Sequence, residues 1–360
     1  MNLFVVGLNH RTAPVQLRER LAVPARELPE AMRILRAASE VSEAVLLSTC
    51  NRVEAYVVSS QPTEAVSTAL IDFLAFRSHL SPERFRSHLY QFSGGEAAQH
   101  LFRVAAGLDS MIVGESEITA QVKYAYLTAQ TQGATGPLLN RLFQQALHAT
   151  KVVRTRTHVA EGSASIGAIV VALAKQVIGE RFAQAHVLLW GAGKAAEATT
   201  KHLVSAGIGQ VWIVNRTDAK AKDLATLCQG QCLSWEQAIG HLAHVDIAVV
   251  CTQAPHYVID RDDLAGILTQ RAGRPLCLID LAVPRNIDPL ARHQPGVQLY
   301  NIDDLQTIAH EALAKRQQEV TQCDVLIEEQ VHHFLRRQRA VRHEEASACS
   351  PVEAGLFVLD

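Results

Sequence analysis

Apolar residues in the first part of the chain predict a mixed domain of strands and helices. Short runs rich in valine and leucine have the composition of strands and lie at 3–8, 44–48 and 53–58. Leucine, alanine, isoleucine and phenylalanine follow a helical spacing over 16–38 and 63–77. We therefore expect an α+β domain over residues 1–155, and long helices between Leu138 and Ile178 that connect it to the next domain.

From His186 onward the pattern changes to an alternation of strands and helices. Apolar strands are expected at 187–190, 211–214, 247–250 and 276–280. Helices are expected from Ala195 to Ser205 and from about Ala219. This alternation indicates a parallel sheet with helices on both faces, so residues 156–305, including a connecting helix, are assigned to a second, α/β domain.

The last part of the chain carries one long apolar stripe. Its spacing predicts a single helix over 306–342, whereas 343–360 has no consistent period and is interpreted as a tail. The composition is that of a globular protein, and no apolar run is long enough for a membrane span. The N-terminus lacks the features of a signal peptide, so a cytoplasmic location is expected. Seven scattered cysteines do not form a disulfide framework, and most should be reduced.

A formal net charge of −2 argues against a protein that wraps nucleic acid without specificity. A local basic surface stays open, although an ordinary solvated helix face explains either cluster equally well. The two clusters are Arg141, Lys151, Arg154 and Arg156, and Arg336, Arg337, Arg339 and Arg342.

A dinucleotide-binding fingerprint follows the strand at 187–190. Gly191-x-Gly193-x-x-Ala196 stands between a predicted strand and a predicted helix, which is the context that the fingerprint requires. After the next strand, Arg216 stands where an NAD enzyme presents a carboxylate; this favours a 2′-phosphate and hence NADPH, the alternative being an ordinary surface arginine. The predicted cofactor residues are Gly191, Ala192, Gly193, Lys194, Ala195, Ala196, Asn215, Arg216 and Thr217.

Cys50 is the candidate nucleophile. It follows an apolar run inside Ser48-Thr49-Cys50-Asn51-Arg52, where polar groups crowd one thiol and the charge of Arg52 could favour a thiolate or bind a substrate carboxylate. From the pattern alone, a buried core cysteine is an equal alternative. The pair Cys228 and Cys232 lacks a second pair of ligands, so no metal site is expected. A nucleophile and a hydride carrier in one chain suggest reduction of an acyl group through a thioester.

Several longer motifs give these features a family context. They lie at 7–14, 48–54, 107–115, 121–123, 153–155, 214–217 and 279–285. In this order and collinear to about residue 340, they resemble glutamyl-tRNA reductase. The resemblance implies an α/β multidomain fold, with an N-terminal α+β catalytic domain that binds glutamyl-tRNA, a Rossmann-type NADPH-binding domain and a spinal-type helix.

The resemblance also implies an activity. Cys50 would attack the ester of glutamyl-tRNA(Glu), and NADPH would reduce the resulting thioester to glutamate-1-semialdehyde, the first step of the five-carbon route to 5-aminolevulinate and tetrapyrroles. No metal is needed. His100 would be important for activity, as an acid/base or orienting group. The implied glutamate-binding residues are Thr49, Asn51, Arg52, Ser110, Glu115, Ser116, Glu117 and Gln121. Implied partners are the downstream glutamate-1-semialdehyde aminomutase and a second copy of the chain.

The chain departs from the family in three places. The family's Pro-Gln is Ser116-Glu117 here, which adds a carboxylate near a site for an anionic substrate. At the joint between the domains, Arg156 and the segment 165–167 differ from the usual residues. The family's helical dimerisation domain is largely missing because the sequence ends at Asp360, which puts dimerisation by that route in doubt.

Two other functions stay open at this point. One is an NADP-dependent dehydrogenase of a free small molecule, whose activity would need neither tRNA nor Cys50. The other is a non-catalytic, truncated homologue that binds tRNA or regulates a full-length enzyme.

Overall fold

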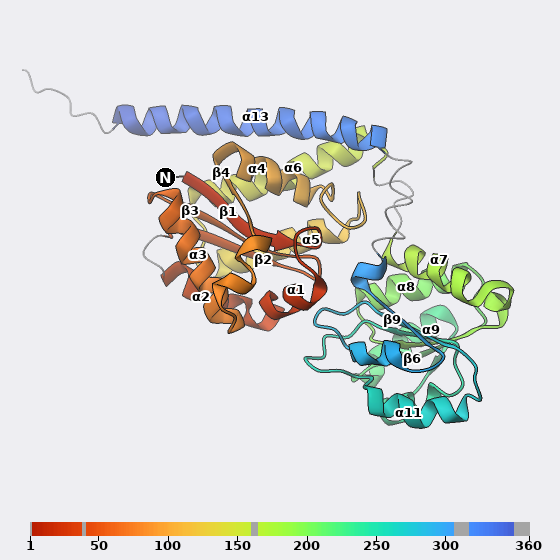
Figure 1. Ribbon diagram of the computed structural model, residues 1–360. Coiled ribbons are helices and arrows are strands. Elements are labelled where there is room, and N and C mark those ends of the chain that lie inside the picture. Colours follow the sequence, from red (N-terminus) through yellow and green to blue (C-terminus); the bar gives the residue numbers. More distant parts are fainter. Residues whose placement is uncertain (1, 38–40, 160–164, 306–316, 349–360) are drawn as a thin grey trace, which may run out of the picture.

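The computed structural model describes residues 2–37, 41–159, 165–305 and 317–348, the last eight of these as backbone only. Two domains lie side by side, and a long helix runs along the first of them (Figure 1). The first domain has strands and helices, as the sequence predicts, and its sheet is antiparallel. The second domain has the predicted parallel sheet.

The N-terminal sheet contains four strands in the order β2-β3-β1-β4. Their bounds are β1 Asn2–Asn9, β2 Glu43–Ser48, β3 Arg52–Ser59 and β4 Tyr90–Ser93. The central pair β1 and β3 is antiparallel along its whole length, with Asn2 opposite Ser59 and Asn9 opposite Arg52. All of β3 is buried. Burial on both faces explains why β1, β2 and β3 appear in the sequence as continuous apolar runs.

Helices cover this sheet, and one prediction about them was wrong. They are α1 Val15–Leu21, α2 Leu28–Ala37, α3 Thr63–Ser78, α4 Gly94–Ala105, α5 Glu117–Thr131 and α6 Pro137–Arg156, with short 3₁₀ turns at Ala25–Glu27, Pro82–Arg84 and Arg86–His88. The single helix predicted over 16–38 is two helices separated by the turn at Ala25–Glu27. Pro24 precedes that turn, and a proline inside a helix removes a backbone donor and clashes with the preceding turn.

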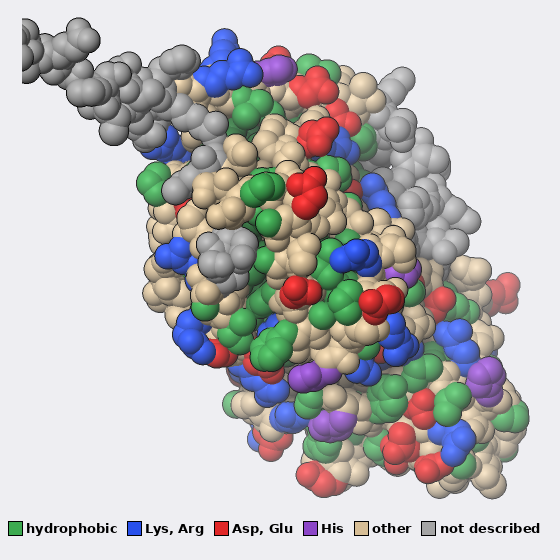
Figure 2. All heavy atoms as spheres, turned by 60° about the vertical axis from the view of Figure 1, so that its left-hand side comes forward, with side chains coloured by type: hydrophobic (Ala, Val, Ile, Leu, Met, Phe, Trp, Pro, Cys, Tyr) green, Lys and Arg blue, Asp and Glu red, His purple; other side chains and the backbone are tan. Residues whose placement is uncertain are grey.

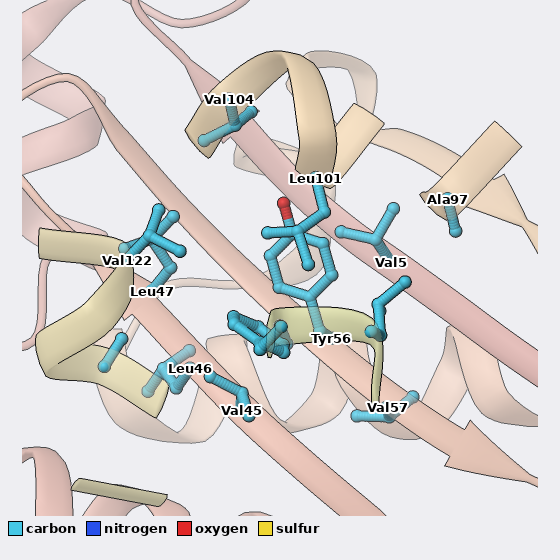
Figure 3. Packing of buried hydrophobic residues seen from close by; sticks show 14 of the residues in the cluster. Val5, Val45, Leu46, Leu47, Tyr56, Val57, Ala97, Leu101, Val104 and Val122 are labelled. Atoms are coloured by element: carbon cyan, nitrogen blue, oxygen red, sulfur yellow. The ribbon is translucent and has the colours of Figure 1, made fainter. Parts of the chain in front are cut away.

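The core of the N-terminal domain includes the layer between the sheet and helices α4, α5 and α6, and buried residues of α2 and α3 belong to the same cluster. Tyr56 of β3 is fully buried and belongs to the same cluster as Leu101 of α4, and both are labelled in Figure 3. The Phe143 ring of α6 meets Tyr56 edge-on, with 5.5 Å between the ring centroids. Because the Tyr56 hydroxyl is buried with the ring, it needs a hydrogen-bond partner. That partner is part of the candidate site.

The second domain has the strand order of dinucleotide-binding folds. Its parallel sheet has the order β10-β9-β8-β5-β6-β7, with β5 His186–Trp190, β6 Gln210–Val214, β7 Gln231–Cys232, β8 Ile247–Val250, β9 Leu276–Asp280 and β10 Val297–Asn301. Its helices are α7 Ile166–Ile178, α8 Lys194–Ser205, α9 Asp218–Cys228, α10 Trp235–His241 and α11 Arg261–Gln270, with 3₁₀ turns at Gly179–Gln184 and Pro289–His293. The order reverses between β5 and β8, where such sheets bind ligands at the carboxyl ends of the strands.

Helix α13, Gln317–Ala348, lies against α4 and α6 of the N-terminal domain (Figure 1). Its buried stripe consists of Cys323, Ile327, Val331 and Phe334, which is helical spacing. The predicted start of this helix, 306–316, lies outside the described residues. The helix continues to Ala348, so residues 343–348 of the predicted tail are helical. Glutamate and alanine at 344–346 favour a helix, and 349–360 lie outside the described residues.

The two domains share an apolar contact. Val15, Met111 and Ile112 of the N-terminal domain belong to the buried cluster of the second domain, where Ile302 and Leu305 also lie. In Figure 1, α1 is at the side of its domain that faces the second domain. Polar contacts between the same surfaces are described below.

Acidic and basic side chains are mixed over the face seen in Figure 2. Of the predicted basic clusters, Arg141, Lys151, Arg156, Arg336, Arg337 and Arg339 are exposed. Arg154 is instead half-buried and donates to the carbonyl oxygen of Glu115 at 2.9 Å. The side chain of Arg342 lies outside the described part. No helix of the described residues is long and apolar enough to cross a membrane.

Candidate active site

Cys50 lies on the turn between β2 and β3. The N–H of Thr49 donates to the carbonyl of Arg52 at 2.8 Å, and Thr49 Oγ1 accepts from the N–H groups of Asn51 and Arg52, each at 3.1 Å. A threonine hydroxyl that binds the backbone two and three residues on stabilises a tight turn without help from other elements. The local sequence therefore holds Cys50 at the edge of the sheet, where the residue is partly exposed.

The surroundings of the Cys50 thiol favour its protonated form. Although part of the residue is exposed, burial of the thiol raises the pKa of Cys50 to about 12. The charges of Glu115 and Glu117 also raise this pKa, while Arg18 acts in the opposite direction. This differs from the expectation that Arg52 favours a thiolate. The charge of Arg52 is compensated by other side chains.

Arg52 is buried and faces two acidic residues. Its Nη1 lies 2.5 Å from Oε1 of Glu54, and its Nη2 donates to the carbonyl and to Oδ2 of Asp109, at 2.5 and 3.0 Å. Its side chain is 1% exposed. Burial alone would lower the pKa of Arg52, but the charge of Glu54 and that of Asp109 raise it above its usual range. Asp109 also accepts from Asn9 Nδ2 at 3.1 Å and pairs with Arg11 at 3.0 Å.

Glu54 is the centre of a buried polar network. Its Oε1 accepts from Arg52, from the Tyr90 hydroxyl at 2.5 Å and from His100 Nε2 at 2.9 Å, and its Oε2 accepts from the Tyr56 hydroxyl at 2.5 Å. Burial would raise the pKa of Glu54, yet the charges of Arg52 and His100 hold it well below its usual range. The carboxylate is therefore ionised. The His100 ring is further held by Tyr90 and Phe92, with centroids 5.1 Å away.

A closed loop over 107–115 brings Ser110 and Glu115 to the same region. The N–H of Gly114 donates to the carbonyl of Gly107 at 3.1 Å. Gly114 has a φ of +84°, and a Cβ there would be 2.1 Å from the carbonyl oxygen of Val159, so only glycine fits. Burial raises the pKa of Glu115 to about 7, which a hydrogen bond from Ser110 partly opposes.

Three further predicted residues lie at the start of α5. Ser116 and Glu117 are exposed, and Gln121 is half-buried. Gln121 Nε2 donates to Glu117 Oε1 at 3.3 Å. Glu117, which stands where the resemblance implies a glutamine, thus binds Gln121, which is itself a predicted substrate-binding residue.

The dinucleotide fingerprint forms the turn between β5 and α8. The N–H of Gly191 donates to the carbonyl of Val214 at 2.8 Å. Gly191 has a φ of +115°, and a Cβ there would lie 2.7 Å from the carbonyl oxygen of Cys251. Helix α8 begins after Gly193, which is exposed, and Ala196 is buried against the sheet. An uncovered helix N-terminus of this kind suits a pyrophosphate.

Arg216 follows β6 at the same edge of the sheet. It is exposed, and its guanidinium carbon lies 5.9 Å from the centroid of the Trp235 ring, a cation–π contact that the sequence did not indicate. Asn215 Nδ2 donates to the carbonyl of Thr217 at 3.1 Å and shapes the turn.

Comparisons with known proteins cover both domains. Residues 6–157 match the model of the glutamyl-tRNAGlu reductase N-terminal domain, and 172–308 match that of shikimate/quinate 5-dehydrogenase. The chain is 42% identical over 335 residues to the glutamyl-tRNA reductase of Desulforudis audaxviator, covering 93% of this chain and 74% of the relative. The chain belongs to the glutamyl-tRNA reductase family.

Two other members of the glutamyl-tRNA reductase family extend the comparison. The relative from Akkermansia muciniphila is 39% identical over 336 residues, which cover 93% of this chain and 98% of the relative. The solved structure of glutamyl-tRNA reductase from Methanopyrus kandleri has a TM-score of 0.54 and 34% identity, covering 96% of this chain and 82% of that one. The family match therefore includes the N-terminal domain and the nucleotide-binding dehydrogenase domain.

Sequence reasoning missed several residues that build this reductase site. His10 is 8% exposed, and its backbone N–H donates to the backbone carbonyl of Asn51 at 2.8 Å. Burial, together with the charge of Arg52, lowers the pKa of His10 to about 3, so the ring is neutral. Two atoms here are buried and have no hydrogen-bond partner in the described part of the chain: Nδ1 of the His10 ring and Oδ1 of Asn51. For Glu54 the sequence did contain a signal of a functional role, because a charged residue there interrupts an apolar strand.

Proposed function

We propose that the chain reduces glutamyl-tRNA(Glu) to glutamate-1-semialdehyde with NADPH, through a thioester on Cys50, as the first step toward 5-aminolevulinate and tetrapyrroles. Membership of the glutamyl-tRNA reductase family supports this proposal. The observation that carries it is the position of Cys50 on a partly exposed turn, two residues before Arg52, which binds Glu54. The second domain matches a nucleotide-binding dehydrogenase domain, which supports binding of the cofactor there.

In the first step, the sulfur of Cys50 bonds to the carbonyl carbon of the glutamyl ester, and the bond to the tRNA oxygen breaks. The thiol proton must leave, and the tRNA oxygen must receive one. Glu115 is suited to accept the thiol proton, because a carboxyl group with a pKa of about 7 exchanges protons readily near neutral pH. His100 is proposed to orient the ester or to protonate the departing oxygen, since its ring is fixed by Glu54.

When bound, NADPH would supply a hydride to the thioester carbon; the carbon–sulfur bond would then break, the Cys50 sulfur would take up a proton, and the aldehyde would leave. The residues of this chain fit the cofactor. Gly191 is required by the turn, because its φ is positive and a Cβ there would meet the carbonyl oxygen of Cys251. The exposed Gly193 before α8 is proposed to let the backbone approach the pyrophosphate, and the exposed Arg216 is proposed to bind the 2′-phosphate. NADPH is therefore proposed in preference to NADH.

The glutamyl group is proposed to lie beside the turn at 49–52 and the loop at 107–115. In addition to Thr49, Asn51 and Ser110, the proposed pocket includes Arg52. Two of the Arg52 nitrogens are held by Glu54 and Asp109, so its proposed contribution is a fixed positive charge rather than a free side chain. The start of α5 provides the remaining proposed residues.

The decisive assay supplies purified protein with glutamyl-tRNA and NADPH, and follows both NADPH oxidation and semialdehyde formation. We expect both with glutamyl-tRNA, and neither with free glutamate or shikimate. Turnover of a free small molecule would support the dehydrogenase alternative. Binding of glutamyl-tRNA without any turnover would support the non-catalytic alternative. The aminomutase partner, the homodimer and the cytoplasmic location stay predictions.

A further inference from the structure

Arg18 of α1 links the Cys50 turn to the other domain. Its Nε donates to the carbonyl oxygen of Cys50 at 3.2 Å, and its Nη1 donates to that of Ala13 at 3.0 Å. Its Nη2 donates to Oδ1 of Asp303 at 2.8 Å. The side chain is 1% exposed. One planar guanidinium therefore contacts the backbone of the nucleophile and a carboxylate of the second domain, which is called the cofactor domain below.

Asp303 is held in place for this contact. It follows β10, and its N–H donates to Oδ1 of Asn301 at 2.8 Å. Its second carboxylate oxygen, Oδ2, accepts the N–H of Val15 at 2.9 Å, which is the first residue of α1. Asp303 thus binds both the start of α1 and the side chain of Arg18 one turn later.

A second ion pair joins the same helix to the same domain. Arg285, on the loop after β9, donates to the Glu19 carboxylate through Nε at 3.0 Å, Nη2 at 2.7 Å and its backbone N–H at 3.1 Å. Both side chains are largely buried. Asp280 holds that loop, because its Oδ2 accepts the N–H groups of Asn286 and Ile287 at 2.8 and 2.9 Å.

Apolar packing adds to the two ion pairs. Met111 and Ile112, which directly follow Ser110, are buried in the core cluster of the cofactor domain. The interface between the domains thus includes α1 and the loop at 107–115, both of which contact the site of Cys50.

We propose that Arg18 is a positioning residue, which makes the geometry of the Cys50 turn depend on docking of the cofactor domain through Asp303. The proposal rests on the proposed function. A guanidinium has a rigid fork of donors, so a shift of Asp303 is transmitted to the Cys50 carbonyl rather than absorbed. Arg18 is also a positive charge that acts against the raised pKa of the thiol. Docking would in this way align the thioester with the bound nicotinamide.

The test separates the two chemical stages in single-turnover experiments. Glutamyl-tRNA with a labelled glutamyl group is first added without NADPH, and the rate of labelling of Cys50 is measured. NADPH is then added, and its oxidation is followed by stopped flow. For Asp303→Asn we expect both labelling and hydride transfer to be slower, and hydride transfer by at least about tenfold, the loss expected for one charge-assisted hydrogen bond. Arg18→Lys keeps the positive charge but loses the planar set of donors, so we expect both labelling of Cys50 and hydride transfer to be slower.

The matched control is Asp304→Asn. Asp304 accepts from the N–H of Asn301 at 2.8 Å and lies 3.8 Å from Arg292, so both of these contacts stay within the cofactor domain. This variant should keep both rates. Glu19→Gln, which weakens the other ion pair without touching the Cys50 turn, should slow only hydride transfer. Thermal unfolding of every variant confirms that it is folded.

A double mutant tests whether Arg18 and Asp303 act together. If Arg18 and Asp303 act as one unit, the Arg18→Lys/Asp303→Asn variant should lose no more hydride-transfer rate than the worse single variant. Additive losses, or an unchanged hydride-transfer rate in Asp303→Asn, would overturn the proposal. A wild-type protein that forms no labelled adduct would instead reject the proposed function, so the two failures are distinguishable.

Discussion

His100 Nε2 donates a hydrogen bond to Oε1 of Glu54 at 2.9 Å, in a network that also binds Arg52. This bond fixes the ring orientation next to an ionised carboxylate. His100→Asn keeps a donor for Glu54 but removes the group that can transfer a proton. We expect labelling of Cys50 by glutamyl-tRNA to slow by about 10²–10⁴-fold, the usual contribution of general acid–base catalysis. Alkylation of Cys50 by iodoacetamide, which has no tRNA leaving group, should change little; equal losses in both reactions would show a structural role instead.

Glu117 raises the pKa of Cys50 and of Glu115 by its negative charge. Removing that charge in Glu117→Gln favours the thiolate, so the thiol pKa should fall. At a fixed pH below that pKa, alkylation of Cys50 should become about two- to fivefold faster, the effect of an exposed charge worth up to about 1 kcal/mol. The difference should shrink in high salt, which screens exposed charges.

A pH series of alkylation rates checks this prediction. Glu64→Gln, which removes an exposed carboxylate at the start of α3, is the matched control and should leave the profile unchanged. A profile for Glu117→Gln that coincides with wild type would mean that Glu117 does not act on the thiol.

Arg216 is the proposed ligand of the 2′-phosphate. Arg216→Gln should raise the KM for NADPH by about 10–100-fold, because a charge-assisted hydrogen bond contributes about 1.5–3 kcal/mol. The KM for NADH should stay nearly constant, since NADH has no 2′-phosphate. Steady-state kinetics with both cofactors measures the ratio, with Arg261→Gln on α11 as an exposed-arginine control. Equal changes for the two cofactors would exclude the proposed contact.

Phe334 joins α13 to the N-terminal core. It is 5% exposed, and its ring centroid lies 6.1 Å from that of Phe102. Phe334→Ala should lower the free energy of unfolding by about 3–5 kcal/mol, through lost burial and a cavity. Val325→Ala on the same helix, where the side chain is 53% exposed, should change it by less than about 0.5 kcal/mol. Urea unfolding compares the two, and similar small effects would mean that α13 is not docked in solution.

The buried strands, including the edge strand β2, could be predicted from the sequence, whereas the partly buried strands could not. Strand β5 is an apolar run because it lies between two neighbouring strands under helices. Strands β4 and β10 lie at sheet edges and are only partly buried, so Tyr90–Ser93 and Val297–Asn301 include polar residues and give no such run. Pro24 and Pro29 were the sequence signal that the segment 16–38 forms two helices rather than one.

The site was predictable where one motif contains it and not where distant residues complete it. Cys50 and its turn are encoded by consecutive residues, so their positions follow from the local sequence. The contact between Arg18 and Asp303 joins residues 285 positions apart. Nothing in a single sequence says which of its acidic residues neutralises a given arginine. The high pKa of the thiol likewise depends on its burial and on the charge of Glu115, and only the folded chain defines both.

The most direct measurement of the central claim is a trapped adduct on the nucleophile. Protein and tRNA carrying labelled glutamate are mixed without NADPH, quenched in acid and digested for mass spectrometry. We predict one glutamyl group on Cys50, sensitive to hydroxylamine as a thioester is, and its conversion to semialdehyde when NADPH is added. Cys232→Ser should behave as wild type, and Cys50→Ser should give neither adduct nor semialdehyde. Semialdehyde formation by Cys50→Ser at the wild-type rate would contradict the thioester route.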